Sequence, residues 1–264
     1  MTHFAMPVAS YMTRPVISVE PDTPLDRVYR VLSERSISCV PVVETGGRAV
    51  GVISRTDLLK LGRLSMGPLG RVQALSWPAA TAGEKMHAGV VTVAADTQVA
   101  TAARILVKQR IHRVFVASGL GVQGVFGTKE ILHAIRDKRP TSPIGDHMST
   151  PAYTVPVTSE VSRAMDRLWS AHVGGLVVVD EEERPIGLFT QVEALLARDL
   201  PPEAPLEGAM SYAMLCLHVS TPLYRAAAHA QATRARRVLV TEDHRVIGVM
   251  TGLDFARAIA GTGG

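Results

Sequence analysis

Apolar and polar positions follow one pattern four times along the chain. In each copy a glycine opens a short apolar stretch, and a polar segment typical of a helix start comes directly after it. The four segments read GVISRTD, GVFGTKE, GLFTQVE and GVMTGLD, and they begin at Gly51, Gly124, Gly187 and Gly248, which are 73, 63 and 61 residues apart. This self-similarity predicts four structural repeats.

A second marker lies upstream of each glycine. Methionines occur in phase with the glycines at Met12, Met86, Met148 and Met210, with spacings of 74, 62 and 62 residues. Two independent markers therefore give the same period.

Within each copy the hydrophobic pattern predicts the order β-α-β-β-α. β-Branched stretches at 16–19, 90–93, 153–157 and 215–219 predict a first strand in each copy. A helix follows, since Leu25, Val28, Val31 and Leu32 share a helical face, as do Val161, Met165 and Leu168. Thr23-Pro24 and Thr221-Pro222 predict a threonine N-cap before a proline at the first helical position, and Asp26 is expected to complete a capping box with Thr23.

Two strands joined by a polar turn come next. They are predicted for CVPVV and AVGVI around 45–47, and for LVVVD and PIGLF around 181–183. A second helix then closes each copy, at 56–61, 129–135, 192–196 and 253–259.

A copy of about 60 residues buries too little surface to be stable alone, so the copies are expected to pack sheet to sheet in pairs. The first pair is predicted at 1–139, with copies at about 9–64 and 84–138, and the second at 140–264, with copies at about 145–199 and 207–260. Residues 136–146 are polar, contain two prolines and suit a linker between the pairs. A second proline-rich stretch, 200–205, separates copies three and four. Residues 62–83 are an insertion with Trp77 that could form an ordered lid or a long loop.

Composition narrows the class of protein. The chain has 264 residues, 47% of them hydrophobic, and a formal charge of +4, which fits a globular protein and gives no dense basic face for nucleic acid. Only two cysteines occur, so neither a disulfide framework nor a CxxC zinc site is expected. The chain lacks a signal-peptide pattern and any apolar run of about 18 residues. We expect a cytoplasmic protein that does not bind membranes.

The four glycine segments, each behind the same β-α-β pattern, resemble those of CBS-domain proteins. The resemblance covers the chain from about Ala9 to Ile259 and implies an α+β fold of four CBS repeats. It implies that the repeats pair into two Bateman modules and form a disc-like assembly. In that family the motif hydroxyl contacts the phosphate of an adenine nucleotide and the aspartate holds the ribose hydroxyls. A carboxylate can accept two hydrogen bonds from a cis-diol, and the start of the second helix favours phosphate.

The four copies match this family pattern unequally. Copy one has the full pattern and so does copy four, whereas copy three has a glutamate for the aspartate and copy two also lacks the hydroxyl. The residues are Ser54, Thr56 and Asp57 in copy one, Thr251 and Asp254 in copy four, Thr190 and Glu193 in copy three, and Gly127 and Glu130 in copy two. One strong nucleotide site per pair is therefore expected, at copies one and four.

Cationic residues offer partners for phosphate. His112-Arg113 resembles the His-Arg pair of some nucleotide-sensing CBS proteins and is expected to serve the ligand held by Asp57. Arg234, Arg236 and Arg237 occupy the equivalent turn of copy four. The alternatives are a solvated basic edge for these arginines and a dipole-stabilising role at a helix start for Asp57 and Asp254.

Two other patterns have simpler interpretations. Gly119 to Gly124 matches GxGxxG, but its last glycine opens a strand, so a dinucleotide-binding fold is not expected. Cys216 and His218 lack further ligands at metal spacing, which favours a core thiol and an incidental histidine.

The sequence thus predicts a regulatory module without catalytic or metal-binding residues. It is expected to bind AMP, ADP, ATP or S-adenosylmethionine as a regulatory ligand and to signal to an unidentified effector protein, as a monomer or a homodimer. A scaffold with degenerate clefts is the alternative, and an enzyme or a nucleic-acid binder is a third hypothesis.

Overall fold

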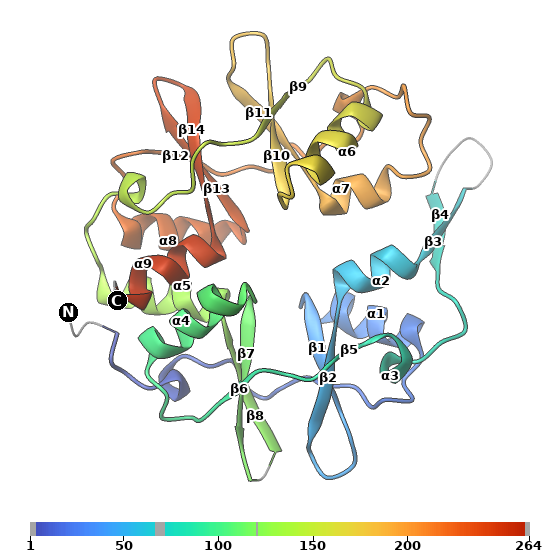
Figure 1. The fold of residues 1–264 in the computed structure, drawn as a ribbon, viewed down its shortest axis with the longest axis vertical. Coiled ribbons are helices and arrows are strands. Elements are labelled where there is room, and N and C mark those ends of the chain that lie inside the picture. The colour runs from blue at the N-terminus through green and yellow to red at the C-terminus, as the bar shows by residue number, and fades with distance from the viewer. Residues whose placement is uncertain (1–3, 67–71, 120, 262–264) are drawn as a thin grey trace. The chain divides into compact units, whose positions relative to one another are not determined.

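The computed structural model describes residues 4–66, 72–119 and 121–261. It contains mixed helices and small sheets that repeat the predicted β-α-β-β-α order (Figure 1). The chain forms two compact units: one of Thr13–Ala95 with Val114–Val125, and one of Met1–Met12, Asp96–Arg113 and Phe126–Gly264. These units group the elements differently from the predicted pairs, and the division of the chain at residue 139 stays a prediction.

The unit built around copy one holds two three-stranded sheets, ordered β1-β2-β5 and β6-β7-β8. Their strands are β1 (Cys39–Val43), β2 (Ala49–Ser54), β5 (His87–Ala88), β6 (Thr92–Val93), β7 (Arg113–Ser118) and β8 (Gly121–Gly127). Helices α1 (Leu25–Glu34), α2 (Arg55–Leu61) and α3 (Ala82–Lys85) belong to the same unit. The core is the predicted helical face against the strands, with Leu25, Val28, Leu32 and Ile53 buried together.

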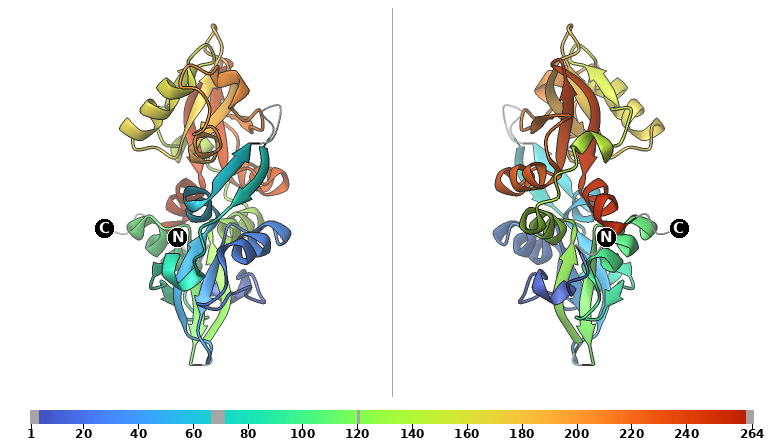
Figure 2. Two further views of the ribbon diagram at one scale, coloured as in Figure 1. Left: turned by 90° about the vertical axis from the view of Figure 1, so that its right-hand side faces the viewer. Right: turned by 90° about the vertical axis from the view of Figure 1, so that its left-hand side faces the viewer.

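The hairpin turns of the two sheets in this unit meet. Gly47 and Gly121 both have positive φ, and the Val122 amide donates to the Gly47 carbonyl oxygen over 3.4 Å. A Cβ on Gly121 would lie 2.5 Å from that oxygen, so a side chain is excluded there. Figure 2 shows the β1–β2 hairpin and β8 side by side.

The other unit contains copies three and four with two helices of copy two. Its strands are β9 (Thr154–Pro156), β10 (Gly175–Val179), β11 (Pro185–Thr190), β12 (Cys216–His218), β13 (Arg237–Glu242) and β14 (Arg245–Thr251). Its helices are α4 (Val99–Gln109), α5 (Thr128–Lys138), α6 (Val161–Ser170), α7 (Gln191–Leu196), α8 (Leu223–Thr233) and α9 (Gly252–Ala260). Helix α5 packs against α8 and α9, and α4 packs against α9 (Figure 1). The two sheets meet where Val177, Val179 and Leu188 contact Leu239.

Each sheet combines parallel and antiparallel pairing. In copy three, β9 runs parallel to β10 and β10 antiparallel to β11, and copy four repeats this with β12, β13 and β14. The predicted first strand of copy one is reduced to one parallel bridge between Val19 and Val42.

The two repeating markers of the sequence contact each other across paired copies. Were a Cβ present on Gly248 it would lie 2.5 Å from the Met148 sulfur, and one on Gly187 would lie 2.9 Å from the Met210 sulfur. In the other unit, a Cβ on Gly51 would lie 2.4 Å from the Met86 sulfur. The methionine of one copy therefore fills the space that the missing side chain leaves in its paired copy.

The residues after these methionines extend the third strand of the partner copy. β5 pairs with β2, Ser149 bridges Val249, and Ser211 bridges Leu188, all antiparallel. The chain thus exchanges short segments between copies three and four in both directions.

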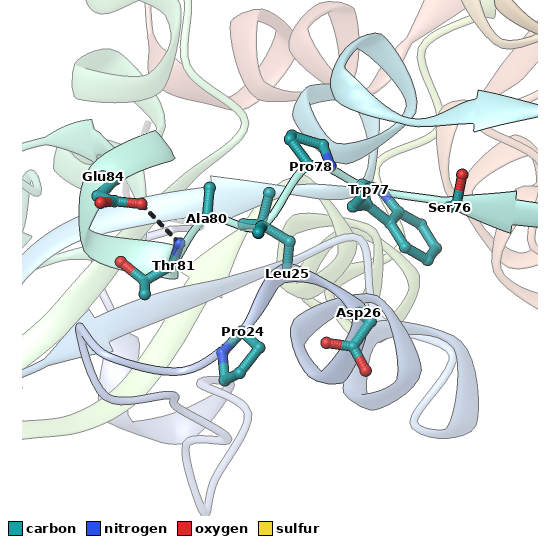
Figure 3. Close-up of a pocket in the computed structure, with 10 residues that line it drawn as sticks. Pro24, Leu25, Asp26, Ser76, Trp77, Pro78, Ala80, Thr81 and Glu84 are labelled. Atoms are coloured by element: carbon teal, nitrogen blue, oxygen red, sulfur yellow. Dashed lines mark hydrogen bonds between the residues drawn. The ribbon is translucent and has the colours of Figure 1, made fainter.

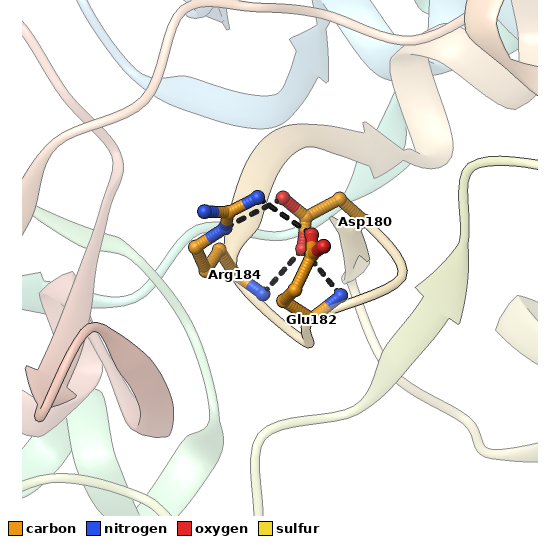
Figure 4. Close-up of polar contacts among 3 residues, drawn as sticks. All are labelled: Asp180, Glu182 and Arg184. Carbon is orange, nitrogen blue, oxygen red and sulfur yellow. Dashed lines mark hydrogen bonds and ion pairs between the residues drawn. The ribbon is translucent and has the colours of Figure 1, made fainter.

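The polar turn of copy three folds around one carboxylate. Asp180 accepts hydrogen bonds from the backbone amides of Glu182 (3.1 Å) and Arg184 (2.8 Å) and pairs with the Arg184 guanidinium (Figure 4). Glu182 pairs with the same guanidinium. This network fixes the predicted turn between β10 and β11.

Three local predictions were wrong. Pro24 and Pro222, not the threonines before them, are the N-cap residues of α1 and α8, and neither makes a side-chain cap. The Thr23 hydroxyl instead accepts from the Glu20 amide (3.1 Å), which leaves Asp26 without its capping partner.

The linker predicted at 136–146 is shorter, since α5 continues to Lys138 and a 3-10 helix begins at Ile144. Cys216 is exposed on β12 and is not a core thiol.

We expect Gly51→Ala to lower the free energy of unfolding by about 1–3 kcal/mol, because the new methyl group overpacks a filled site. It would lie 2.6 Å from the His87 carbonyl oxygen, and backbone cannot rotate away as a side chain can. Gly119→Ala is the matched control, since nothing lies within 4 Å of its Cβ position. Urea unfolding of both variants checks this, and equal midpoints would contradict the packing described here.

Candidate functional site

The motif hydroxyls and acids form capping boxes at the starts of the second helices. In α2 the Ser54 amide donates to Asp57 Oδ2 (2.9 Å), and the Asp57 amide donates back to Ser54 Oγ (3.2 Å). Thr190 with Glu193 and Thr251 with Asp254 make corresponding contacts at α7 and α9. The motif therefore has a structural role, because it satisfies amides that a helix start leaves unpaired.

Copy two retains half of this arrangement. Glu130 is buried and accepts the Gly127 amide through Oε2 (3.0 Å), and glycine has no hydroxyl to return the bond. A Cβ at Gly127 would lie 2.4 Å from the His112 carbonyl oxygen. Close packing therefore accounts for the missing hydroxyl.

Asp57 is contacted by a residue that follows a marker methionine. Its Oδ1 lies 3.1 Å from His87 Nε2, while its Oδ2 accepts the Ser54 amide and hydroxyl. The Asp57 side chain is 17% exposed and the His87 side chain 72% exposed. Burial raises the pKa of Asp57, but the hydrogen bonds from Ser54 and His87 outweigh it and hold this pKa below its usual value.

Asp254 is more completely enclosed. Its Oδ2 accepts the amide (2.6 Å) and hydroxyl (2.7 Å) of Thr251, and its Oδ1 accepts the Ser149 hydroxyl (2.7 Å). The Arg257 guanidinium makes a short ion pair with the same Oδ1, and the Asp254 side chain is 4% exposed. Ser149 follows Met148, as His87 follows Met86.

Glu193 lies near an arginine of the partner copy. Its Oε2 accepts the Thr190 amide (3.0 Å) and makes a short contact with the Thr190 hydroxyl. The Arg237 guanidinium lies over Gly174 and Gly175, next to Thr190, and donates to the Gly174 carbonyl oxygen. Burial lowers the pKa of Arg237, and the charge of Glu193 opposes that shift. The Glu193 carboxylate and the Arg237 guanidinium thus lie near each other, and the guanidinium is partly shielded from solvent.

Several positive charges act on His112, the residue directly before β7. Burial lowers the pKa of His112, and the charges of Arg113, Arg236 and Arg237 lower it further. The start of α5 is part of this region, since the Thr128 amide donates to the His112 carbonyl oxygen (3.1 Å). Four of the cationic residues singled out in the sequence therefore belong to one electrostatic group.

Two further predicted residues lie at the ends of helices. Arg234 is the exposed C-cap residue of α8 in a left-handed conformation, and Thr56 lies in the first turn of α2. The pairing of His112 or Arg113 with the ligand of Asp57 stays a prediction.

Sequence analysis missed three contacts of the motif acids: those from His87, Ser149 and Arg257. The first two could have been found, because both directly follow a repeating methionine. Arg257 could not, since a basic residue three places after an acid on a helix is common on solvated surfaces.

The insertion of copy one forms a hairpin and a pocket. Strands β3 (Arg63–Met66) and β4 (Val72–Ser76) pair, and Trp77 follows them. The Trp77 indole donates to the Leu58 carbonyl oxygen (2.9 Å) and packs 4.6 Å from the Tyr29 ring. Figure 3 shows Trp77 beside α1 among the residues that line an open pocket. The volume of this pocket is about 640 Å³. Its lining includes Pro24, Asp26, Trp77, Pro78, Thr81 and Glu84.

Other chemistry is sparse in the described ranges. Gly124 lies inside β8, so the GxGxxG segment opens a strand and does not lead into a helix. Among residues 4–66, 72–119 and 121–261, no three His, Cys, Asp or Glu side chains group as a metal site would require. No helix within those ranges combines the length and apolar character that a membrane span needs.

The fold and these contacts define a repeat protein whose motif acids and hydroxyls lie at the starts of its helices. The CBS domain model matches residues 8–63, 82–137, 144–199 and 205–261. The chain belongs to the CBS-domain family, and the predicted four-repeat fold is confirmed.

Three known proteins are similar to this chain over nearly its whole length. Uncharacterized protein MJ1404 of Methanocaldococcus jannaschii is 24% identical over 96% of this chain, which spans 62% of that protein. Protein MJ1225 from the same organism, put forward as an archaeal homolog of g-AMPK, has a similar structure, with a TM-score of 0.76 at 15% identity, covering 96% of this chain and all of that one. An uncharacterized conserved protein from Pyrococcus horikoshii has a similar structure, with a TM-score of 0.69 at 17% identity and the same coverage of both chains. At these identities the structural likeness shows the fold.

Asp57→Asn should lower the free energy of unfolding by about 1 kcal/mol at pH 7, because it weakens a capping box. Since the folded pKa of Asp57 is lowered, the stabilising contribution is complete above the ordinary value of 3.8 and is lost as the pH falls below it. Urea unfolding from neutral to acidic pH measures this difference. Asp166→Asn, on the exposed face of α6, is the control, and a difference independent of pH would refute the assignment.

Proposed function

We propose that this protein is a non-catalytic regulatory module that binds adenine nucleotides between paired CBS repeats and signals to a partner protein. Family membership supports the class of protein, and it is consistent with AMP, ADP, ATP or S-adenosylmethionine as the ligand. The chain spans less than two thirds of MJ1404, so the effector protein belongs to this proposal as well.

The observation that carries the proposal is the meeting of Glu193 and Thr190 with Arg237. Glu193 Oε2 accepts the Thr190 amide at the start of α7. In the described part of the chain, Glu193 Oε1 accepts no hydrogen bond. That oxygen is available to a ribose hydroxyl. Arg237, with Arg236 beside it, supplies charge for a phosphate, and a charge-assisted hydrogen bond contributes about 1.5–3 kcal/mol.

The arginines of this group support an anionic ligand. Burial lowers the pKa of His112, and the charges of Arg113, Arg236 and Arg237 lower it further. Arginine suits phosphate because its planar guanidinium can donate two parallel hydrogen bonds.

A scaffold without ligands is the competing function. The capping boxes favour it, since they give the motif acids a structural task that needs no nucleotide. The two functions differ in whether an adenine nucleotide raises the thermal stability of the protein.

Arg237→Gln should raise the Kd for AMP or ATP at least tenfold, because about 1.4 kcal/mol separates each tenfold step. Arg245→Gln is the matched control in the same copy, since Arg245 is 65% exposed and pairs only with exposed Glu183 among the described residues. Isothermal titration calorimetry measures both. Equal affinities in the two variants would reject this site, and a wild type that binds none of the four ligands would favour the scaffold.

A further inference from the structure

The motif acids differ in how many hydrogen bonds they can still accept. A carboxylate offers about four lone-pair positions on two oxygens. On Asp254 all four are occupied, by the Thr251 amide, the Thr251 hydroxyl, the Ser149 hydroxyl and the Arg257 guanidinium. With its side chain 4% exposed, Asp254 has neither a free acceptor position nor access to solvent.

Asp57 and Glu193 are not closed in this way. Asp57 has three donors, and the third is His87, whose side chain is 72% exposed and can rotate into solvent. Both contacts described for Glu193 come from Thr190 and reach a single oxygen. Each of these two acids therefore keeps an acceptor position that a diol could use.

One helical position accounts for the difference between copies three and four. Three residues after the acid, copy four has Arg257 and copy three has Leu196. Residues three apart share a helix face, so Arg257 reaches back to Asp254, while Leu196 has no charge and is 50% exposed. Copy one has Lys60 there, and among the described contacts it makes no ion pair with Asp57.

The Asp254 ion pair is also shielded from solvent on one side. Arg257 is 55% exposed, but the carboxylate that it contacts is buried, and the guanidinium also donates to the Ser149 hydroxyl (3.1 Å). Ser149 is held in place by its backbone bridge to Val249. A ligand would therefore have to break contacts from two elements to reach Asp254.

We propose that Arg257, supported by Ser149, closes the Asp254 carboxylate of copy four to nucleotides, so that copies three and four bind their nucleotide at Glu193. This inference rests on the proposed function and reverses the expectation from the sequence, where copy four matches the family motif and copy three departs from it. Arg257 is a specificity-determining residue, since it decides which motif acid of the pair accepts a ligand.

Calorimetric titration with AMP tests this through two exchanges between copies. Arg257→Leu gives copy four the residue of copy three, and it should raise the number of AMP molecules bound per chain by one. The double variant Arg257→Leu with Asp254→Asn should lose that added site. Leu196→Arg gives copy three the residue of copy four, and it should weaken binding at Glu193 at least tenfold.

Controls separate this inference from the proposed function. Arg245→Leu removes an exposed arginine and should leave the number of bound AMP molecules unchanged, while circular dichroism of each variant checks its folding. If wild type binds no AMP but Arg257→Leu binds one, the closed cleft holds and the Glu193 site fails. If Arg257→Leu binds no more AMP than wild type, or Leu196→Arg binds as well as wild type, the inference is overturned.

Discussion

The contact between a methionine of one copy and the motif glycine of its partner is the constraint on which the rest of the structure depends. A glycine leaves a gap on the third strand, and the sulfur of Met86, Met148 or Met210 occupies it. The residues that follow the methionine then pair with that same strand. Side-chain packing and backbone hydrogen bonds therefore act together, and neither copy of such a pair completes its sheet alone. This explains why both markers keep one period while the helices between them vary.

The exchanged segment also sets the chemistry of each cleft. It places the residue after the methionine against the motif acid of the partner, as His87 is placed on Asp57 and Ser149 on Asp254. The acid itself is held at a helix start by its capping box. What differs is the set of donors around it, and a single helical residue such as Arg257 can complete that set. Copies with the same motif geometry therefore differ in how many acceptor positions their acid keeps.

Much of the fold could be predicted because its determinants are local and repeated. The strands around Val40 and Val177 and the buried face of Leu25, Val28 and Leu32 follow from hydrophobic period alone. The predicted N-cap of α1 was wrong, because Pro24 occupies the position that we had assigned to Thr23. The site was harder to predict, because the sequence motif is the same whether the acceptor positions of its acid are free or occupied by other donors. The contacts of Asp254 with Ser149 and of Arg237 with Gly174 join residues 105 and 63 positions apart, and only the folded chain brings them together.

We infer that a nucleotide binds in copy three and not in copy four. A crystal structure of the chain grown with AMP would test this inference. We expect ribose hydroxyls on Glu193, phosphate beside Arg237, and the Asp254–Arg257 ion pair intact. A nucleotide held by Asp254 with Arg257 displaced, or clefts without AMP at saturating concentration, would contradict it.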